Sequence, residues 1–309
     1  MSGQIRYAGS GVPVDGVTVS LEGPVPTSAP TDSTGHFAFT DLPEATWRIV
    51  PQKAGGANNS ISASDALAVL QTILGERSPP PAQVLACDVN GDGKLSAVDA
   101  LLVLFYKVQE ITSFPAAQQC GSDWVFVPQP TTVANVQAMP PGLGSGACQR
   151  GGIYWTPLTS QAEGQDFVAA LFGDCSGSWQ SAAAGLQRNV INDTGAIRLG
   201  RTLVNRGRSS RHGTRLRVPV SITSPTDIRA LDLTLRYDPK AMTPMGVERT
   251  HAARHALVAM HVTEPGRLAL SLASTTPLQR GPVVLLQFES QAASAHVILD
   301  VTSAMMSAN

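Results

Sequence analysis

The stretch DVNGDGKLSAVD at residues 88–99, followed by the apolar run ALLVL at residues 100–104, decides how the centre of this chain folds. Oxygen-bearing side chains stand at its first, third and fifth positions, and Gly93 at the sixth position allows a sharp turn. Ca²⁺ prefers about six to eight oxygen ligands, and this spacing gathers oxygens around one point before a helix begins. The predicted ligands are Asp88, Asn90, Asp92, the carbonyl of Lys94, Ser96 through a water molecule, and Asp99. The alternative is a metal-free Asx/Gly turn that caps the helix.

The same stretch has a second, weaker copy earlier in the chain. ISASDALAVL at residues 61–70 aligns with LSAVDALLVL at residues 95–104, and most positions are identical. Such a repeat predicts two loop–helix units in tandem. The first loop has Ala54 and Gly56 where the second has its first two ligands. The remaining candidate oxygens of the first loop are Asn58, the carbonyl of Ser60, and Asp65. We expect a turn without metal there, with weak calcium binding as the alternative.

Tandem loops of the form Asp-x-Asn-x-Asp-Gly that end in Asp and lead into short Leu-rich helices resemble a type I dockerin module. The resemblance covers about residues 54–112, and its second half is the specific part. It implies a calcium-binding module that docks onto other proteins.

Composition restricts the classes of function. The chain has 309 residues, enough for about two to four domains. Charged residues make up 15% and the formal net charge is −1, so the overall charge predicts no attraction to nucleic acid or to an anionic membrane. No apolar run reaches the length of a membrane span. A strand pattern follows Met1 directly, so we expect a mature or excised chain without a signal peptide.

Four cysteines predict an oxidising, extracellular setting. Their spacing lacks Cys-x-x-Cys pairs, which argues against a zinc site. Three pairings are possible, and we favour Cys87–Cys120 with Cys148–Cys175 because each joins neighbours in the sequence. Four buried free thiols are the alternative.

Residues 1–53 alternate apolar and polar positions between turn signals, which predicts strands. The order SGQI, VPVDGVTVSL and TDSTGHFAFTDLP is similar to the carboxypeptidase regulatory-like, transthyretin-like sandwich. That resemblance implies a structural companion domain without catalytic residues.

Residues 113–190 concentrate the aromatic residues among prolines. We predict that this irregular β segment packs on the N-terminal sandwich, with residues 54–112 inserted in a loop. Its aromatic side chains are expected in a core, with sugar binding as the alternative. Residues 191–213 are rich in Arg, Gly and Ser and are interpreted as a flexible basic linker.

Residues 214–309 again alternate with the period of strands and predict a second sandwich. The order VPVSI, IRALDLTLRYDP, PGRLALSLA and VLLQFE resembles a cohesin domain, a jelly roll that is the partner of dockerins. The chain stops at Asn309, where that family has a last strand, so we expect an open sheet edge. His251, His255 and His261 are interpreted as surface or loop residues rather than zinc ligands.

The fold class is therefore mainly β, with two β-sandwich domains and a small α calcium-binding insert. No nucleophile elbow, phosphate loop, paired-carboxylate signature or His-Glu-x-x-His motif is present, so we expect no enzyme activity. The leading hypothesis is a secreted structural protein that binds Ca²⁺ and other copies of itself and grows head to tail into a filament. The alternatives are a scaffold or adhesion fragment that docks other dockerin or cohesin proteins, and the accessory part of a polysaccharide-degrading system.

Overall fold

The computed structural model describes residues 1–144, 146–180, 196–200, 202–205, 214–223, 227–290 and 299–308. The chain divides into two compact units. The first unit comprises residues 1–61, 72–99 and 113–187, and the second comprises residues 62–71, 100–112 and 188–309. Each unit is mainly β, as predicted.

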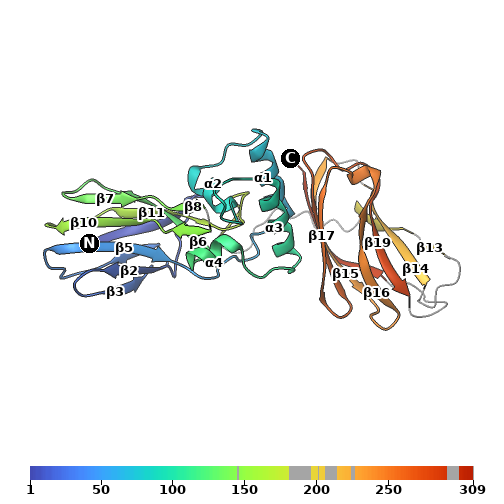
Figure 1. The fold of residues 1–309 in the computed structure, drawn as a ribbon, viewed down its shortest axis with the longest axis horizontal. Coiled ribbons are helices and arrows are strands. Elements are labelled where there is room, and N and C mark those ends of the chain that lie inside the picture. The colour runs from blue at the N-terminus through green and yellow to red at the C-terminus, as the bar shows by residue number, and fades with distance from the viewer. Residues whose placement is uncertain are drawn as a thin grey trace. The chain divides into compact units, whose positions relative to one another are not determined.

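The first unit contains two sheets (Figure 1). One has the order β4-β1-β11-β6, and the other has the order β3-β2-β5-β10-β7. Between β7 and β10 in the sequence, β8 and β9 form a separate two-stranded sheet. The strands are β1 (Ser2–Tyr7), β2 (Thr18–Glu22), β3 (Thr27–Pro30), β4 (His36–Ala38), β5 (Ala45–Gln52), β6 (Trp124–Pro130), β7 (Val136–Met139), β8 (Gly142–Gly144), β9 (Ala147–Gln149), β10 (Gly152–Leu158) and β11 (Gln165–Leu171).

Strands from distant parts of the sequence pair within these sheets. β1 runs parallel to β11, with Ile5 opposite Phe167, and β5 runs antiparallel to β10, with Trp47 opposite Trp155. All four of these side chains are fully buried. The strands of residues 124–171 thus share sheets and core with those of residues 2–52, and the helical segment lies between them in sequence.

Two short helices in the first unit begin with proline. They are α2 (Pro81–Cys87) and α4 (Pro115–Cys120). Proline suits the first helical position because its missing N–H would have no partner there and its φ is already helical.

The two helices of the repeat are α1 (Ala63–Ile73) and α3 (Ala97–Lys107). The division into compact units runs through both: residues 62–71 and 100–112 belong to the second unit. Among the described residues, no helix has the length and apolar character needed to cross a membrane.

The second unit contains a two-sheet sandwich. One sheet has the order β12-β14-β19-β16, with β13 also on β14, and the other has the order β17-β18-β15-β20. Alternate residues of the long strands point into one core, which includes Leu231, Leu270 and Leu286. The elements are β12 (Ile197–Leu199), β13 (Leu203–Asn205), β14 (Thr214–Ile222), β15 (Ile228–Tyr237), β16 (Met242–Arg249), the 3₁₀ helix η3 (His251–Ala253), β17 (Leu257–Glu264), β18 (Arg267–Ala273), β19 (Gly281–Ser290) and β20 (Leu299–Ala308).

The linker interpretation of residues 191–213 needs a correction. Ile197–Leu199 and Leu203–Asn205 are strands that pair with β14, and the rest of that range lies largely outside the described residues. Both strands are three residues long, so neither shows the alternation over about four to eight residues by which strands are recognised.

Candidate functional site

The loop of residues 88–99 wraps its backbone around two carboxylates. Asp88 accepts hydrogen bonds from the N–H groups of Gly91, Asp92 and Gly93 at 3.0, 3.2 and 2.8 Å. Gly91 and Gly93 have φ values of 74° and 86°, in the left-handed region that glycine adopts without steric cost. The turn is therefore built by the first residue of the motif together with two glycines.

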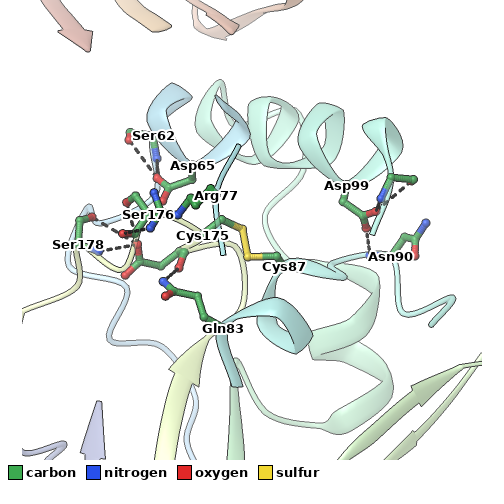
Figure 2. Close-up of a disulfide and its surroundings, with 12 residues drawn as sticks. Ser62, Asp65, Arg77, Gln83, Cys87, Asn90, Asp99, Cys175, Ser176 and Ser178 are labelled. Atoms are coloured by element: carbon green, nitrogen blue, oxygen red, sulfur yellow. Dashed lines mark hydrogen bonds between the residues drawn. A yellow bond between two sulfur atoms is a disulfide. The ribbon is translucent and has the colours of Figure 1, made fainter. Parts of the chain in front are cut away.

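Asp99 closes the other end of this loop. Its carboxylate accepts the N–H of Asn90 at 3.1 Å and the N–H and hydroxyl of Ser96 at 2.9 and 3.0 Å (Figure 2). Ser96 is the residue before α3 and Asp99 the third residue within it, so the pair forms a capping box. Ser96 thus donates to Asp99, whereas we expected it to reach a metal through water.

The first unit of the repeat has the same cap. Asp65 accepts the N–H and hydroxyl of Ser62 at 2.7 and 3.0 Å at the start of α1. The shared motif Ser-Ala-x-Asp therefore has a structural role in both copies. The candidate ligands that the second loop has and the first lacks are at the first and third positions, Asp88 and Asn90.

The charge of the second loop fits a cation. Burial raises the pKa of Asp88, and the nearby charge of Asp99 raises it further. Burial also raises the pKa of Asp99, and the charge of Asp92 adds to that increase. A divalent cation would offset this repulsion, and Ca²⁺ takes the carboxylate, amide and carbonyl oxygens that the loop provides.

The carboxylates are nevertheless engaged with the backbone rather than gathered on a common point. Within the part of the chain that the structure describes, no three His, Cys, Asp or Glu side chains form a metal-binding group. Calcium binding at this loop therefore stays a prediction. The residues that would hold the ion are Asp88, Asn90, Asp92, Asp99 and the carbonyl of Lys94.

Hydrogen bonds from other parts of the protein hold the first loop, whereas the second loop offers candidate calcium ligands. The indole N–H of Trp124 donates to the carbonyl of Gly55 at 2.8 Å, and that of Trp179 donates to the carbonyl of Gly56 at 2.6 Å. Asp123 accepts the N–H of Gly55 at 2.6 Å. These bonds hold the first loop through protein groups, and its metal-free state stays a prediction.

The predicted oxygens of the first loop also have other partners. The side-chain amide of Asn58 donates to the carbonyl of Gln180 at 3.2 Å, and the carbonyl of Ser60 accepts the hydroxyl of Ser178 at 3.2 Å. Asn58 and Asn59 both have positive φ values, 48° and 59°, which suits a tight asparagine turn.

A buried carboxylate that the sequence did not identify supports this arrangement. Asp174 is 1% exposed and accepts the hydroxyl of Tyr7 at 2.6 Å and the N–H of Trp179 at 2.7 Å. The ring of Trp179 packs against Trp124 edge to face, with centroids 4.8 Å apart. The turn around Asp174 thus positions Trp179 for the first loop.

Replacing Trp179 with phenylalanine tests whether these bonds hold the first loop. Loss of the donor to Gly56 should lower the free energy of unfolding by about 1 kcal/mol. The matched control is Trp155→Phe, because the indole N–H of Trp155 is buried and has no hydrogen-bond partner within the described residues. Urea denaturation should show a larger loss for Trp179→Phe than for Trp155→Phe, with calcium stoichiometry unchanged in both. Equal losses would show that the bond contributes nothing.

The disulfides differ from the pairing that we favoured. The bonds are Cys87–Cys175, which Figure 2 shows, and Cys120–Cys148. The pairing of Cys87–Cys120 with Cys148–Cys175 was therefore wrong. The parallel pairing of β1 with β11 and the antiparallel pairing of β11 with β6 bring the end of β11 back toward the helical segment. Cys175 follows β11 and therefore meets Cys87 at the end of α2. Sequence neighbourhood is a poor guide when a sheet is completed by distant strands.

The remaining candidate residues, three tryptophans and two histidines, are buried in a core or contact a neighbouring side chain. The tryptophans at positions 124, 155 and 179 are at most 1% exposed. The prediction that they pack in a core is therefore confirmed, and the alternative of sugar binding is wrong for them. His251 and His255 each contact the guanidinium of Arg254 at 2.7 Å.

The chain is similar to solved structures of cohesins. The sixth cohesin of scaffoldin B from Acetivibrio cellulolyticus, solved in complex with a Cel5 dockerin mutant, is 13% identical with a TM-score of 0.28, over 31% of this chain and 78% of that one. A non-cellulosomal cohesin from Archaeoglobus fulgidus is 17% identical with a TM-score of 0.28, over 35% and 79%. A Clostridium thermocellum Coh-OlpA–Doc918 complex chain is 15% identical with a TM-score of 0.28, over 37% and 92%.

None of the curated proteins compared matches the sequence of the chain. The family model described as "Dockerin type I domain" matches residues 57–106. This range contains both capping boxes and the second loop with all its predicted ligands. The resemblance of the repeat is thereby confirmed, and residues 57–106 form a type I dockerin domain within a longer chain.

Proposed function

We propose that this chain is a non-catalytic, secreted structural protein that acts by docking. Its dockerin domain, stabilised by calcium, binds the cohesin-like sandwich of another copy, and the copies assemble head to tail into an extracellular filament. The observation that carries the proposal is the dockerin domain at residues 57–106 on a chain that also ends in a two-sheet sandwich. The sequence of that sandwich resembles the family that dockerins bind.

Two features support the extracellular setting and the structural role. All four cysteines are paired in disulfides, which persist in oxidising compartments. The N-terminal sheets, similar in sequence to a carboxypeptidase regulatory-like sandwich, would serve as a companion that holds the first dockerin loop through Trp124 and Trp179.

Contact between a dockerin domain and a sandwich on different copies is heterologous, because each copy gives one surface and receives the other. Such contacts close a ring or propagate an open filament. A second route is strand addition. β20 and β17 end the order β17-β18-β15-β20 among the described strands, and an exposed edge can accept a strand from a neighbour.

The test is the mass of the full chain in solution. Light scattering after size exclusion, at rising protein concentration and with calcium or a chelator, should show calcium-dependent growth, and negative-stain microscopy should show filaments. Growth that is identical in chelator would favour strand addition over dockerin docking. A monodisperse monomer at the highest concentration in calcium would contradict the filament.

A further inference from the structure

The second loop, residues 88–99, is fastened to parts of the chain outside the range that matches the dockerin model. The N–H of Ala116, in the first turn of α4, donates to the carbonyl of Val89 at 3.0 Å. The first N–H groups of any helix lack a partner within it, and here the loop supplies one. The N–H of Gly173 donates to the carbonyl of Ala86, just before the loop, at 3.0 Å. Elements that follow the dockerin range therefore anchor the loop at its entry.

The side chain of Gln119, on α4, lies directly against the backbone of this loop at Gly91. A β-carbon placed on Gly91 would lie 2.6 Å from Oε1 of Gln119 and 3.2 Å from its Cδ. A contact below 3.0 Å is too short for a real β-carbon, so Gln119 fills the space that a side chain at position 91 would need. Gln119 is itself exposed, and it therefore covers the loop from the solvent side.

The hairpin of β8 and β9 lies against the same loop two residues further on. A β-carbon placed on Gly93 would lie 3.1 Å from the carbonyl oxygen of Leu143 and 3.6 Å from Cα of Gly144. Cys148 of β9 stands opposite Leu143, and its disulfide to Cys120 joins the hairpin to the end of α4. The two contacts with the loop thus come from elements that one disulfide links. We call α4, β8 and β9 together the cap.

The hairpin depends on that disulfide for its position. Each of its two strands has three residues, and none of their side chains is buried. A two-stranded hairpin of this size is marginally stable at best by itself. A pocket lined by Cys120, Phe126, Leu143 and Cys148, among others, lies beneath it, so close packing does not hold the hairpin there. The covalent link to α4 is what keeps it against the loop.

The loop has to move where the cap touches it before it can take Ca²⁺. Both oxygens of Asp88 accept N–H groups of residues 91–93, so this carboxylate can turn toward an ion only when some of these bonds loosen. The backbone that carries those N–H groups is the backbone that Gln119 and Leu143 contact. A contact that resists this movement raises the barrier to entry and to exit alike. The affinity, which is the ratio of the two rates, then changes little.

We infer that the cap controls how fast calcium enters and leaves the second loop, with Gln119 as a positioning residue and the Cys120–Cys148 bond as the anchor of the hairpin. The inference rests on the proposed function, because it concerns the calcium of the dockerin domain. It adds a kinetic property that residues outside the dockerin range supply. Slow exchange lets the domain keep its ion through a brief fall in free calcium.

The test is stopped-flow release of calcium from the full chain into a fluorescent chelator, with calorimetric titration for the affinity. Gln119→Ala removes the cover from Gly91, and Cys120→Ser together with Cys148→Ser frees the hairpin from α4. Each should speed release roughly fivefold to tenfold with Kd nearly unchanged, because lost contacts make local opening easier. The matched control is Gln118→Ala, because Gln118 is an exposed glutamine one residue earlier on the same helix.

Two further measurements separate the cap from general stability. Hydrogen–deuterium exchange in chelator should be faster for residues 88–95 in both variants, whereas peptides of β5 and β10 in the same unit should keep their protection. Gln119→Met keeps the length of the side chain without its amide. It should release calcium as slowly as the unmutated chain, because Gln119 acts by filling space beside Gly91.

Faster release in Gln119→Ala and in the double serine variant, with the rate unchanged in Gln118→Ala, is the expected result. Unchanged release in both variants would overturn the inference and leave the docking function standing. A weaker Kd with an unchanged rate of binding would show that the cap stabilises the bound loop and does not control exchange, which also overturns it. Absence of calcium binding by the unmutated chain would contradict both the inference and the calcium-stabilised docking proposed above.

Discussion

Replacing Asp88 and Asp92 together with alanine should abolish calcium binding at residues 88–99. The double change removes two anionic ligands from an all-oxygen site, and neither position has a substitute nearby in the motif. In the unmutated chain, calcium at about a hundred times its dissociation constant should stabilise the folded state by about 2.7 kcal/mol. For units of this size that corresponds to a rise in Tm of roughly 5–10 °C.

The measurement is calorimetric titration together with thermal unfolding in calcium and in chelator. Asp88 also accepts three backbone N–H groups, so alanine lowers stability even without metal. The informative quantity is therefore the difference between calcium and chelator for each variant, not the Tm itself. Asp88→Asn, which keeps an oxygen acceptor for the turn, separates the two effects.

The matched control is Asn58→Ala at the fifth position of the first loop. Its side chain donates to Gln180, so we expect one calcium per chain before and after this change. Two calcium ions per unmutated chain would contradict the metal-free first loop. A Tm that is the same in calcium and in chelator would contradict the calcium prediction altogether.

Local pattern was enough to predict the features that depend on nearby residues. The alternation of Leu231, Leu233 and Leu235 predicted a strand with one face in a core, because side chains alternate along any strand. The spacing from Asp88 to Asp99 predicted a turn followed by a helix. In both cases, the residues whose pattern predicts the element are the same residues that form it.

The features that the sequence left open depend on contacts between distant residues. In the sequence, Asp232 is one polar residue in a strand of leucines. Its structural role comes from the hydrogen bond that it accepts from the N–H of Ala63, 169 residues earlier. Trp124 and Trp179 are core residues, as predicted, yet their indole N–H groups also donate to the carbonyls of Gly55 and Gly56 in the first loop. No periodicity encodes which carbonyl an indole reaches.

The same reasoning explains the disulfides and leads to the second large effect. The Cys87–Cys175 bond joins residues 88 apart, whereas the Cys120–Cys148 bond joins residues 28 apart. Loop-closure entropy predicts a loss of roughly 4–5 kcal/mol when the first bond is removed and roughly 3–4 kcal/mol for the second. Removing Cys87–Cys175 by alanine at both positions should therefore destabilise the first unit more, by about 1 kcal/mol.

The two bonds should also differ in their effect on calcium. Cys87 ends α2 and is followed at once by Asp88, the first predicted ligand, so the bond to Cys175 fixes the entry to the calcium loop. We expect the double alanine variant at Cys87 and Cys175 to bind calcium more weakly than the variant at Cys120 and Cys148. Guanidinium denaturation measures the stability, calorimetric titration measures the affinity, and mass mapping of unreduced peptides checks the pairing. Equal calcium affinity in the two variants would show that the loop is positioned by its capping box alone, since Asp99 and Ser96 remain in both.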